Sequence, residues 1–268
     1  MPEPTSTART HRENQVLVEV PPRASLGTTV WTLLRWTMAQ TGAMMPLFIV
    51  VQAAIAGAVV VGFGLLIPDI DTPTAELLST GAPTILILVI GLVLCPWGVA
   101  SARTSGTLTY QRALPVPRPL LLISDLIVWL VIALPSIPVT VLVAYLRYGI
   151  DYSFDWLLLV GAFVLTTVMA VSVGYAIAVL LSPALSQLVS QVMVFFVMLF
   201  SPVTFPAEQL PNWFQAVHDV LPFQAAADLL RAGLLSDRFE PSGHALVVLL
   251  VWCLLGLTIS VRSIIRRG

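Results

Sequence analysis

The sequence contains no lysine and few charged residues of either sign. Its 268 residues include 13 basic residues, all of them arginine, and 14 acidic ones. A soluble domain carries about 25% charged residues, whereas this chain has 10% charged and 57% hydrophobic residues. Too little charge is present to cover a surface that faces water, so the composition predicts a membrane protein.

The missing lysine excludes two kinds of catalytic site. A P-loop needs a lysine to reach the nucleotide phosphates, and a Schiff-base enzyme needs a lysine amine. We therefore expect no ATPase site and no bound cofactor on this chain. The net charge of -1 and the isoelectric point near 6.3 lack the basic excess that nucleic-acid binding uses, so no nucleic-acid partner is expected.

Metal-ligating and catalytic residue types are also scarce. The two cysteines, Cys95 and Cys253, lie inside apolar runs far from further soft ligands, which favours buried thiols over a disulfide or a zinc site. The three histidines, His11, His218 and His244, are far apart in the sequence. No pair of carboxylates faces a common apolar segment, so we expect no metal site and no enzymatic activity.

Long apolar runs take up much of the chain. Six of them are long enough to cross a bilayer as helices: residues 43–67, 81–101, 120–146, 156–181, 188–206 and 243–261. Asp125 is the only formal charge within them. Because backbone polar groups cannot stay unpaired in hydrocarbon, these runs predict an all-α membrane protein with six transmembrane helices.

The chain before the first run divides into two parts. Residues 1–23 are polar and lack the apolar core of a secretory signal, so they predict a cytoplasmic tail ahead of a single transmembrane domain over residues 24–268. Between residues 26 and 38, apolar side chains recur on one helical face, and Trp31 and Trp36 suit the level of the lipid headgroups. This pattern predicts an N-terminal helix that lies in the membrane interface.

The placement of arginine predicts the orientation. With six spans, ten of the 13 arginines fall on the side of the two termini and three on the other. The positive-inside rule then predicts that both termini lie in the cytoplasm. We expect the membrane to be the plasma membrane.

The connection after the second run, residues 103–119, is longer than an antiparallel helix pair needs. Gly106 is expected to end the helix of span two, and Thr107 can cap a new one. Residues 108–114 would then form about two helical turns before a cluster of prolines. The segment is either a short helix that docks on a cytoplasmic partner or a polar connector whose arginines only set the topology.

A second unusual connection, residues 206–242, combines many apolar residues with scattered acids. Its spacing predicts two short amphipathic helices near residues 212–220 and 224–235, which are too short to span. We expect them to be outer re-entrant half-helices between spans five and six. They would dip into the outer leaflet or cap a cavity, unless they only cover the outer ends of the spans.

Two groups of residues resemble the ABC-2 family of ABC-transporter permeases, and the resemblance covers nearly the whole chain. The first group lies in the loop after span two: Gly106, Thr107, Leu108, Leu114, Pro115, Val116 and Arg118. The second follows span five: Ser201, Pro202, Phe205, Pro206, Leu210, Pro211, Trp213, Pro222 and Phe223. The chain departs from the family pattern at residues 102–104, which lack acidic residues, and at Asp125, where many relatives have a lysine.

The resemblance implies partners and an assembly. In the family, the interfacial helix and the first cytoplasmic loop contact a separate ATP-binding cassette subunit, which is present in two copies and holds the MgATP. Two permease chains, identical or homologous, face each other across the transport path within the lipid. On this chain the implied docking residues are Arg35, Gly106, Thr107, Leu108, Gln111, Arg112 and Leu114.

The predicted spans carry few groups that could bind a solute. Their centres are uncharged, which argues against ion-coupled transport, and Asp125 is expected to have a structural role within reach of Arg103 or Arg118. The candidate residues of a translocation path are polar, aromatic or flexible: Gln52, Gln191, Phe195, Phe196, Met198 and Phe200. Helix packing would explain each of these residues as well.

These observations predict the membrane subunit of an ATP-driven exporter for hydrophobic drug-like or lipid-like cargo. Two alternatives stay open at this point. One is a permease that exports a polysaccharide or glycolipid, and the other is a membrane anchor subunit that transports nothing.

Overall fold

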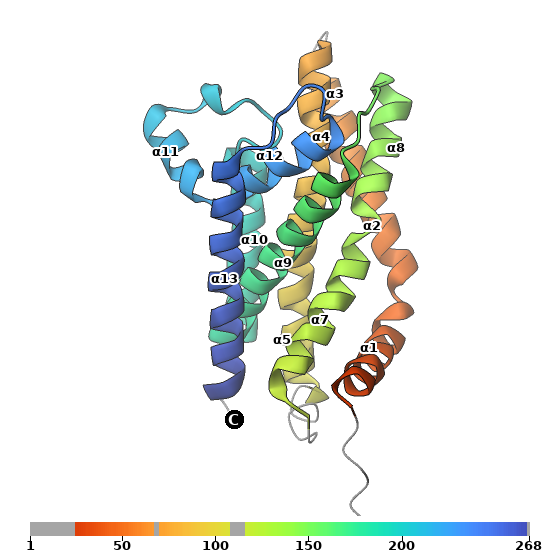
Figure 1. Ribbon diagram of the computed structural model, residues 1–268, viewed down its shortest axis with the longest axis vertical. Helices are drawn as coiled ribbons and strands as arrows, with labels where there is room; N and C mark the ends of the chain where they lie inside the picture. The colour runs from red at the N-terminus through yellow and green to blue at the C-terminus, as the bar shows by residue number, and fades with distance from the viewer. Residues whose placement is uncertain (1–24, 67–69, 108–115, 267–268) are drawn as a thin grey trace, which may run out of the picture.

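A computed structural model describes residues 25–66, 70–107 and 116–266, and the regular secondary structure in these ranges is entirely helical (Figure 1). The first half of the chain forms α1 (Leu26–Gly42), α2 (Met45–Gly57), η1 (Ala58–Gly62), α3 (Phe63–Leu66), α4 (Thr72–Val89), η2 (Ile90–Leu94), α5 (Cys95–Thr104), α7 (Arg118–Ala133) and α8 (Ser136–Tyr148). The second half forms α9 (Trp156–Leu180), α10 (Pro183–Phe200), η3 (Ala207–Gln209), α11 (Asn212–Val220), α12 (Pro222–Leu234) and α13 (Gly243–Arg266).

Six helices in the described ranges are long and apolar enough to cross a membrane: Met45–Gly62, Thr72–Thr104, Pro119–Tyr148, Trp156–Leu180, Pro183–Phe200 and Gly243–Ser263. The first three are composite, since they contain α2 with η1, then α4, η2 and α5, then α7 and α8. The prediction of an all-α membrane protein with six transmembrane helices is therefore confirmed.

The second span begins at Thr72 instead of residue 81. Asp71 caps this helix, since its carboxylate accepts the backbone N–H of Thr74 at 3.3 Å, and hydrogen bonding to Thr74 lowers the pKa of Asp71. The predicted start at residue 81 lies after the charge of Glu76. In the structure Glu76 is buried within the helix and forms an ion pair with Arg238, so this charge does not mark the end of the span.

The fifth span is shifted toward the N-terminus relative to residues 188–206. α10 begins at Pro183, where the Ser182 hydroxyl accepts the N–H of Leu185 at 3.5 Å. It ends at Phe200, because Pro202 has no N–H with which to continue the helix. The chain then turns inward, and Val203 is buried.

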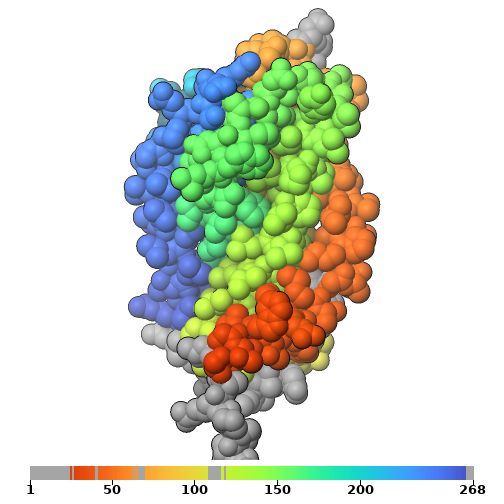
Figure 2. Space-filling model, turned by 45° about the vertical axis from the view of Figure 1, so that its right-hand side comes forward, coloured from red at the N-terminus to blue at the C-terminus, as the bar shows by residue number. Residues whose placement is uncertain are grey.

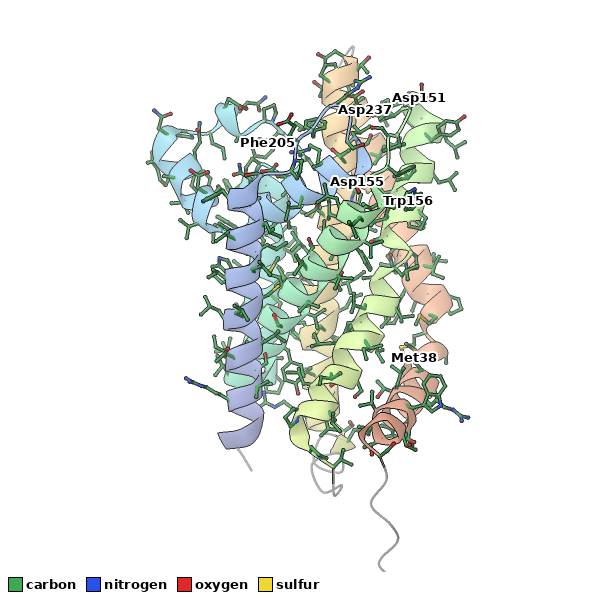
Figure 3. The ribbon with its side chains drawn as sticks, in the orientation of Figure 1. Met38, Asp151, Asp155, Trp156, Phe205 and Asp237 are labelled. Carbon is green, nitrogen blue, oxygen red and sulfur yellow. The ribbon has the colours of Figure 1, made fainter. Side chains whose placement is uncertain are left out.

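The two ends of the bundle differ in their charged residues. α1 and the last residues of α13 lie at one end, which we call the arginine-rich end (Figure 1). Figure 3 shows Met38 at this end and Asp151, Asp155 and Asp237 at the opposite one, which we call the acidic end. The six spans thus separate a cationic face from an anionic one.

α1 lies at the arginine-rich end, beside the start of the third span (Figure 2). Leu34 and Met38 pack against a small core that includes Val128 and Ile132 of α7, whereas Trp31 is exposed. This arrangement agrees with the amphipathic pattern of residues 26–38.

α9 is the central helix of the bundle, and glycine lets two backbones meet there. A Cβ on Gly174 would lie 2.0 Å from the carbonyl oxygen of Gly91, and a Cβ on Gly91 would lie 2.4 Å from the Cβ of Ala170. Small residues at such crossings are how helices associate closely in lipid. The crossing therefore joins α9 to η2 of the second span.

α12 is buried among α4, α9 and α13, and it carries a buried arginine. Arg231, which is 6% exposed, donates to the Thr80 hydroxyl at 3.2 Å, to the Val203 carbonyl at 3.0 Å and to the Asp228 carboxylate at 2.9 Å. Burial lowers the pKa of Arg231, and the charge of Asp228 opposes this effect. One side chain thus links α12 to the second span and to the turn after α10.

Adding a methyl group at the α9 crossing should destabilise the protein. Gly174→Ala is expected to cost about 1 to 3 kcal/mol, the usual range for overpacking, because the new Cβ would meet the Gly91 backbone. Unfolding of the detergent-solubilised protein measures this loss. Gly161→Ala on the same helix has open space around it and should be neutral or stabilising; equal stability of the two variants would contradict the proposed contact.

Removing the Arg231 side chain should weaken the acidic end of the bundle. Arg231→Leu leaves the Asp228 carboxylate and the Val203 carbonyl without their donor, and breaking a buried pair in this way costs about 3 to 5 kcal/mol. Arg147→Leu removes an exposed arginine at the same end and serves as the matched control. Similar melting temperatures for both variants would show that the Arg231 contacts do not stabilise the fold.

Candidate transport groove and docking surface

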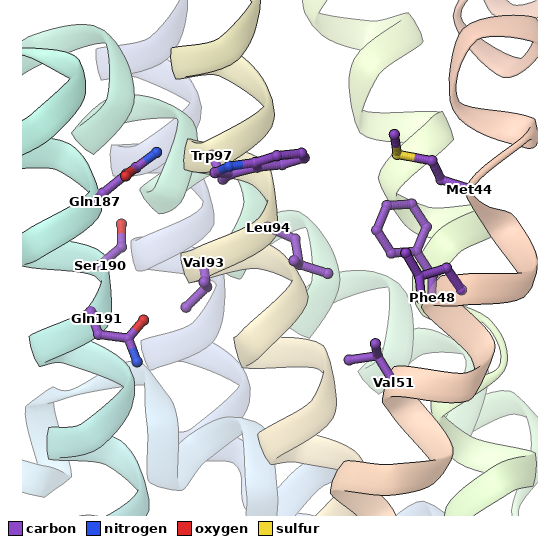
Figure 4. Close-up of a pocket in the computed structure, with 10 residues that line it drawn as sticks. Met44, Phe48, Val51, Val93, Leu94, Trp97, Gln187, Ser190 and Gln191 are labelled. Atoms are coloured by element: carbon purple, nitrogen blue, oxygen red, sulfur yellow. The ribbon is translucent and has the colours of Figure 1, made fainter.

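A groove with polar groups inside the spans lies between the first, second and fifth spans (Figure 4). Its volume is about 440 Å³. Three spans contribute the residues that line it. They are Met44, Leu47, Phe48 and Val51 at the start of the first span, Val93, Leu94 and Trp97 of the second, and Gln187, Ser190 and Gln191 of α10.

The polar groups of the groove all come from α10. Gln187 and Gln191 are four residues apart and therefore share one helical face, and both are exposed. The Ser190 hydroxyl is buried and has no hydrogen-bond partner among the described residues. No charged side chain lines the groove. It is suited to an apolar, uncharged molecule that carries a few hydrogen-bonding groups.

A turn of π-helix shapes the second wall. In η2 the backbone N–H of Cys95 donates to the carbonyl of Ile90, five residues back, and such bulges often occur at functional sites. The wide turn lies next to Pro96, which has no N–H of its own. Val93 and Leu94 reach the groove from this turn, while Gly91 faces α9.

Of the six residues predicted for the path, Gln191 lines the groove. Gln52 is 3% exposed and donates to the Ile132 carbonyl at 2.9 Å, so it joins the first span to the third, as the packing alternative expects. Phe195 is exposed and lies outside the groove lining, and Met198 packs against the main core.

The remaining two path candidates belong to an aromatic cluster at the acidic end. Phe196 contacts Phe200, with ring centroids 5.7 Å apart, and it also stacks on His218 at 5.9 Å. Phe214 meets Phe196 edge to face at 6.2 Å. Phe196 and Phe200 therefore hold α11 against α10, away from the groove.

Most groove residues were not predicted from the sequence. Gln187 lies one residue before the predicted start of span five and is therefore absent from the predicted path. Gln187 and Gln191 are four residues apart, and this spacing could have indicated that both lie on one helical face. Phe48, Val93, Leu94 and Trp97 read as ordinary apolar span residues and give no signal of their own.

At the arginine-rich end, the structure describes part of the predicted docking surface. Gly106 has φ of 78° and follows the end of α5, which confirms that it ends the helix; the Thr107 hydroxyl is 2.9 Å from that of Ser105. Arg35 is exposed on α1. The other docking candidates lie outside the described residues: Leu108, Gln111, Arg112 and Leu114.

Arg103 does not pair with Asp125. Its guanidinium instead donates to the carbonyls of Ala178 and Leu181, at 2.6 and 2.7 Å, where the end of α9 leaves carbonyls unpaired. Asp125 has no ion pair among the described side chains, and the side chain of Arg118 lies outside that set. Arg103 thus joins the end of α5 to the end of α9.

Six apolar helices long enough to cross a bilayer define a multi-pass membrane protein. The model of the family described as ABC-2 type transporter matches residues 28–235. The chain belongs to this family. The matched region starts within α1 and ends at the end of α12, so the match does not include α13. No curated protein matches the chain.

Filling the groove should block cargo. Gln191→Trp places a large side chain in the cavity. It should lower the cargo-stimulated ATPase activity of the reconstituted complex by about tenfold or more, because a loss of about 1.4 kcal/mol in the free energy of cargo binding weakens the affinity tenfold. Leu254→Trp, at an exposed position of α13, is the matched control and should leave the stimulation intact. Full stimulation of Gln191→Trp would show that cargo does not use the groove.

Proposed function

We propose that this chain is the permease subunit of an ATP-binding cassette exporter that moves hydrophobic drug-like or lipid-like cargo out of the cytoplasm. Membership of the ABC-2 family implies an ABC transporter permease that works with an ABC ATPase subunit. The observation that carries the choice of cargo is the groove, which has apolar walls, three polar side chains and no charge. A charged solute would find no partner there.

The arginine-rich end faces the cytoplasm in this proposal. The positive-inside rule favours that orientation, and it places α1, Gly106 and the end of α13 on the side where an ATPase subunit would bind. The groove residues Met44 and Gln187 belong to the ends of their spans nearest to that side. Cargo would therefore enter from the cytoplasm or the inner leaflet.

Arg103 offers a route by which the ATPase subunit can act on the groove. A partner that moves the segment after Gly106 pulls on the end of α5, and Arg103 carries that displacement to the end of α9. Trp97 lies on the same short helix and lines the groove. Nucleotide-dependent closure of the partner would thus change the wall of the groove as a rigid-body shift.

A second permease chain, identical or homologous, would cover the exposed face of α10. Gln187 and Gln191 are exposed there in a segment that lies within hydrocarbon, and amides in lipid find partners across helix interfaces. Association of two chains along α10 would satisfy these amides and close the groove. The assembly would then contain two permeases and two ATPase subunits.

Mutating the predicted docking helix should release the ATPase subunit. The double variant Leu108→Asp with Leu114→Asp is expected to reduce the ATPase recovered with the purified permease by about tenfold, because a few apolar anchors dominate most interfaces, while insertion into the membrane stays normal. Copurification from the native host measures it.

Leu146→Asp, at the acidic end on an exposed position of α8, is the control for the added negative charge. If the double variant retains the ATPase as well as this control does, the docking assignment is wrong. If the wild-type chain itself brings down no ATPase, the exporter function is wrong and the chain is a membrane anchor of another kind.

A further inference from the structure

Residues of α11, α12 and the start of α13 line a small polar pocket. Figure 1 shows these three helices at the acidic end. Its volume is about 180 Å³. Six polar residues line it together with Ala225 and Ala245: His218, Asp219, Gln224, Asp228, Ser242 and His244. The indole N–H of Trp252 donates to the Val220 carbonyl at 2.8 Å, which holds α13 against the junction of α11 and α12.

Two buried polar side chains in this pocket have atoms that lack a hydrogen bond of normal geometry. His218 is 0% exposed, and neither of its ring nitrogens makes such a bond with a described residue, although the Phe200 carbonyl lies close enough to raise its pKa. Phe196 and Phe214 hold the ring, at centroid distances of 5.9 and 4.7 Å. The side-chain oxygen of Gln224 is also buried and unpartnered. Buried polar groups in folded proteins normally have partners, so these groups point to a missing ligand.

The charges that line the pocket are negative. Asp219 and Asp228 are both in the lining, and the pocket has no arginine in it. Arg231 contacts one carboxylate oxygen of Asp228 from the side, at 2.9 Å. Burial raises the pKa of Asp228, while the charge of Arg231 and a hydrogen bond with the Gln224 side chain oppose this effect. An anion would be repelled here, whereas a cation that donates hydrogen bonds would be attracted.

The available atoms are mostly acceptors. Burial lowers the pKa of His218, and the Phe200 carbonyl and the Asp219 charge oppose this only in part. The imidazole is therefore neutral near neutral pH and keeps one nitrogen as an acceptor. The Gln224 oxygen and the Asp228 carboxylate add two more acceptors. Three acceptors that line one small pocket beside negative charge match a group with three N–H donors.

A metal ion fits less well than such a group. Within the parts of the chain that the structure describes, no three His, Cys, Asp or Glu side chains are arranged to hold a metal ion. We propose that the pocket bounded by His218, Gln224 and Asp228 binds an alkylammonium group. This group can come from the headgroup of an amine-bearing lipid or from a free amine in solution.

Thermal unfolding of the purified full-length chain in phosphatidylcholine nanodiscs tests the proposal. Ethylammonium chloride should raise the melting temperature, because a ligand stabilises the state that binds it. Tetramethylammonium chloride, which has the charge but no N–H, should not. In a second arm, nanodiscs that contain phosphatidylethanolamine replace the soluble amine.

Two variants remove acceptors without changing the size of the side chains greatly. His218→Phe keeps the aromatic packing, and Gln224→Met keeps the chain length; each should weaken ethylammonium binding by about tenfold, the effect expected for one hydrogen bond to a charged group. Gln209→Met makes the same change at an exposed position outside the pocket and should bind as the wild type does.

The two arms distinguish the source of the amine. Stabilisation by ethylammonium in phosphatidylcholine indicates a free amine, whereas stabilisation by phosphatidylethanolamine alone indicates the lipid; either result supports the proposal if both pocket variants weaken it. Equal stabilisation by tetramethylammonium, unchanged stabilisation of both variants, or no response in either arm overturns it. None of these results depends on the ATPase partner, so the exporter function can fail separately.

Discussion

The close backbone contact between Gly91 and Gly174 is the constraint on which the arrangement of the spans depends. Lipid gives helices no hydrophobic reason to associate, so close packing and hydrogen bonds between helices must do so. Glycine provides the close packing at this crossing, because without a Cβ the second span and α9 approach to backbone contact. On another face of α9, Gly256 of α13 lies against Ser172, and the Ser260 hydroxyl donates to the Ser172 carbonyl at 3.0 Å.

Polar side chains in the bundle fall into two classes. The first class binds its own helix or a neighbour: the Thr167 hydroxyl donates to the Phe163 carbonyl, and the Tyr148 hydroxyl donates to the carbonyl of Val60 in the π-turn of the first span. The second class is buried but unpartnered. Ser190 and His218 belong to it, and both line cavities. In these two places an unpaired group can be satisfied by a bound molecule.

Much of the fold was predictable because the bilayer imposes a simple rule. Long apolar runs must be helices, so the number of spans and the bounds of α11 followed from the sequence. The start of the second span did not, because the burial and pairing of Glu76 with Arg238 depend on residues 162 positions apart. The groove was missed for a similar reason: its walls come from three distant segments, and the π-turn that shapes one wall has no sequence pattern beyond the nearby Pro96.

The groove lies where three mechanical units meet. α5 is joined to α9 through Arg103, and the first span is joined to the third through Gln52. α10 is the third unit, and its span has the smallest buried share of the six described. Among the described residues that line the groove, no hydrogen bond or ion pair joins one wall to another. Phe48 of the first span packs in one core with Ile90 and Leu94 of the second, so apolar contacts hold these two walls together. Such contacts are not directional, and walls joined by them can shift without breaking a hydrogen bond.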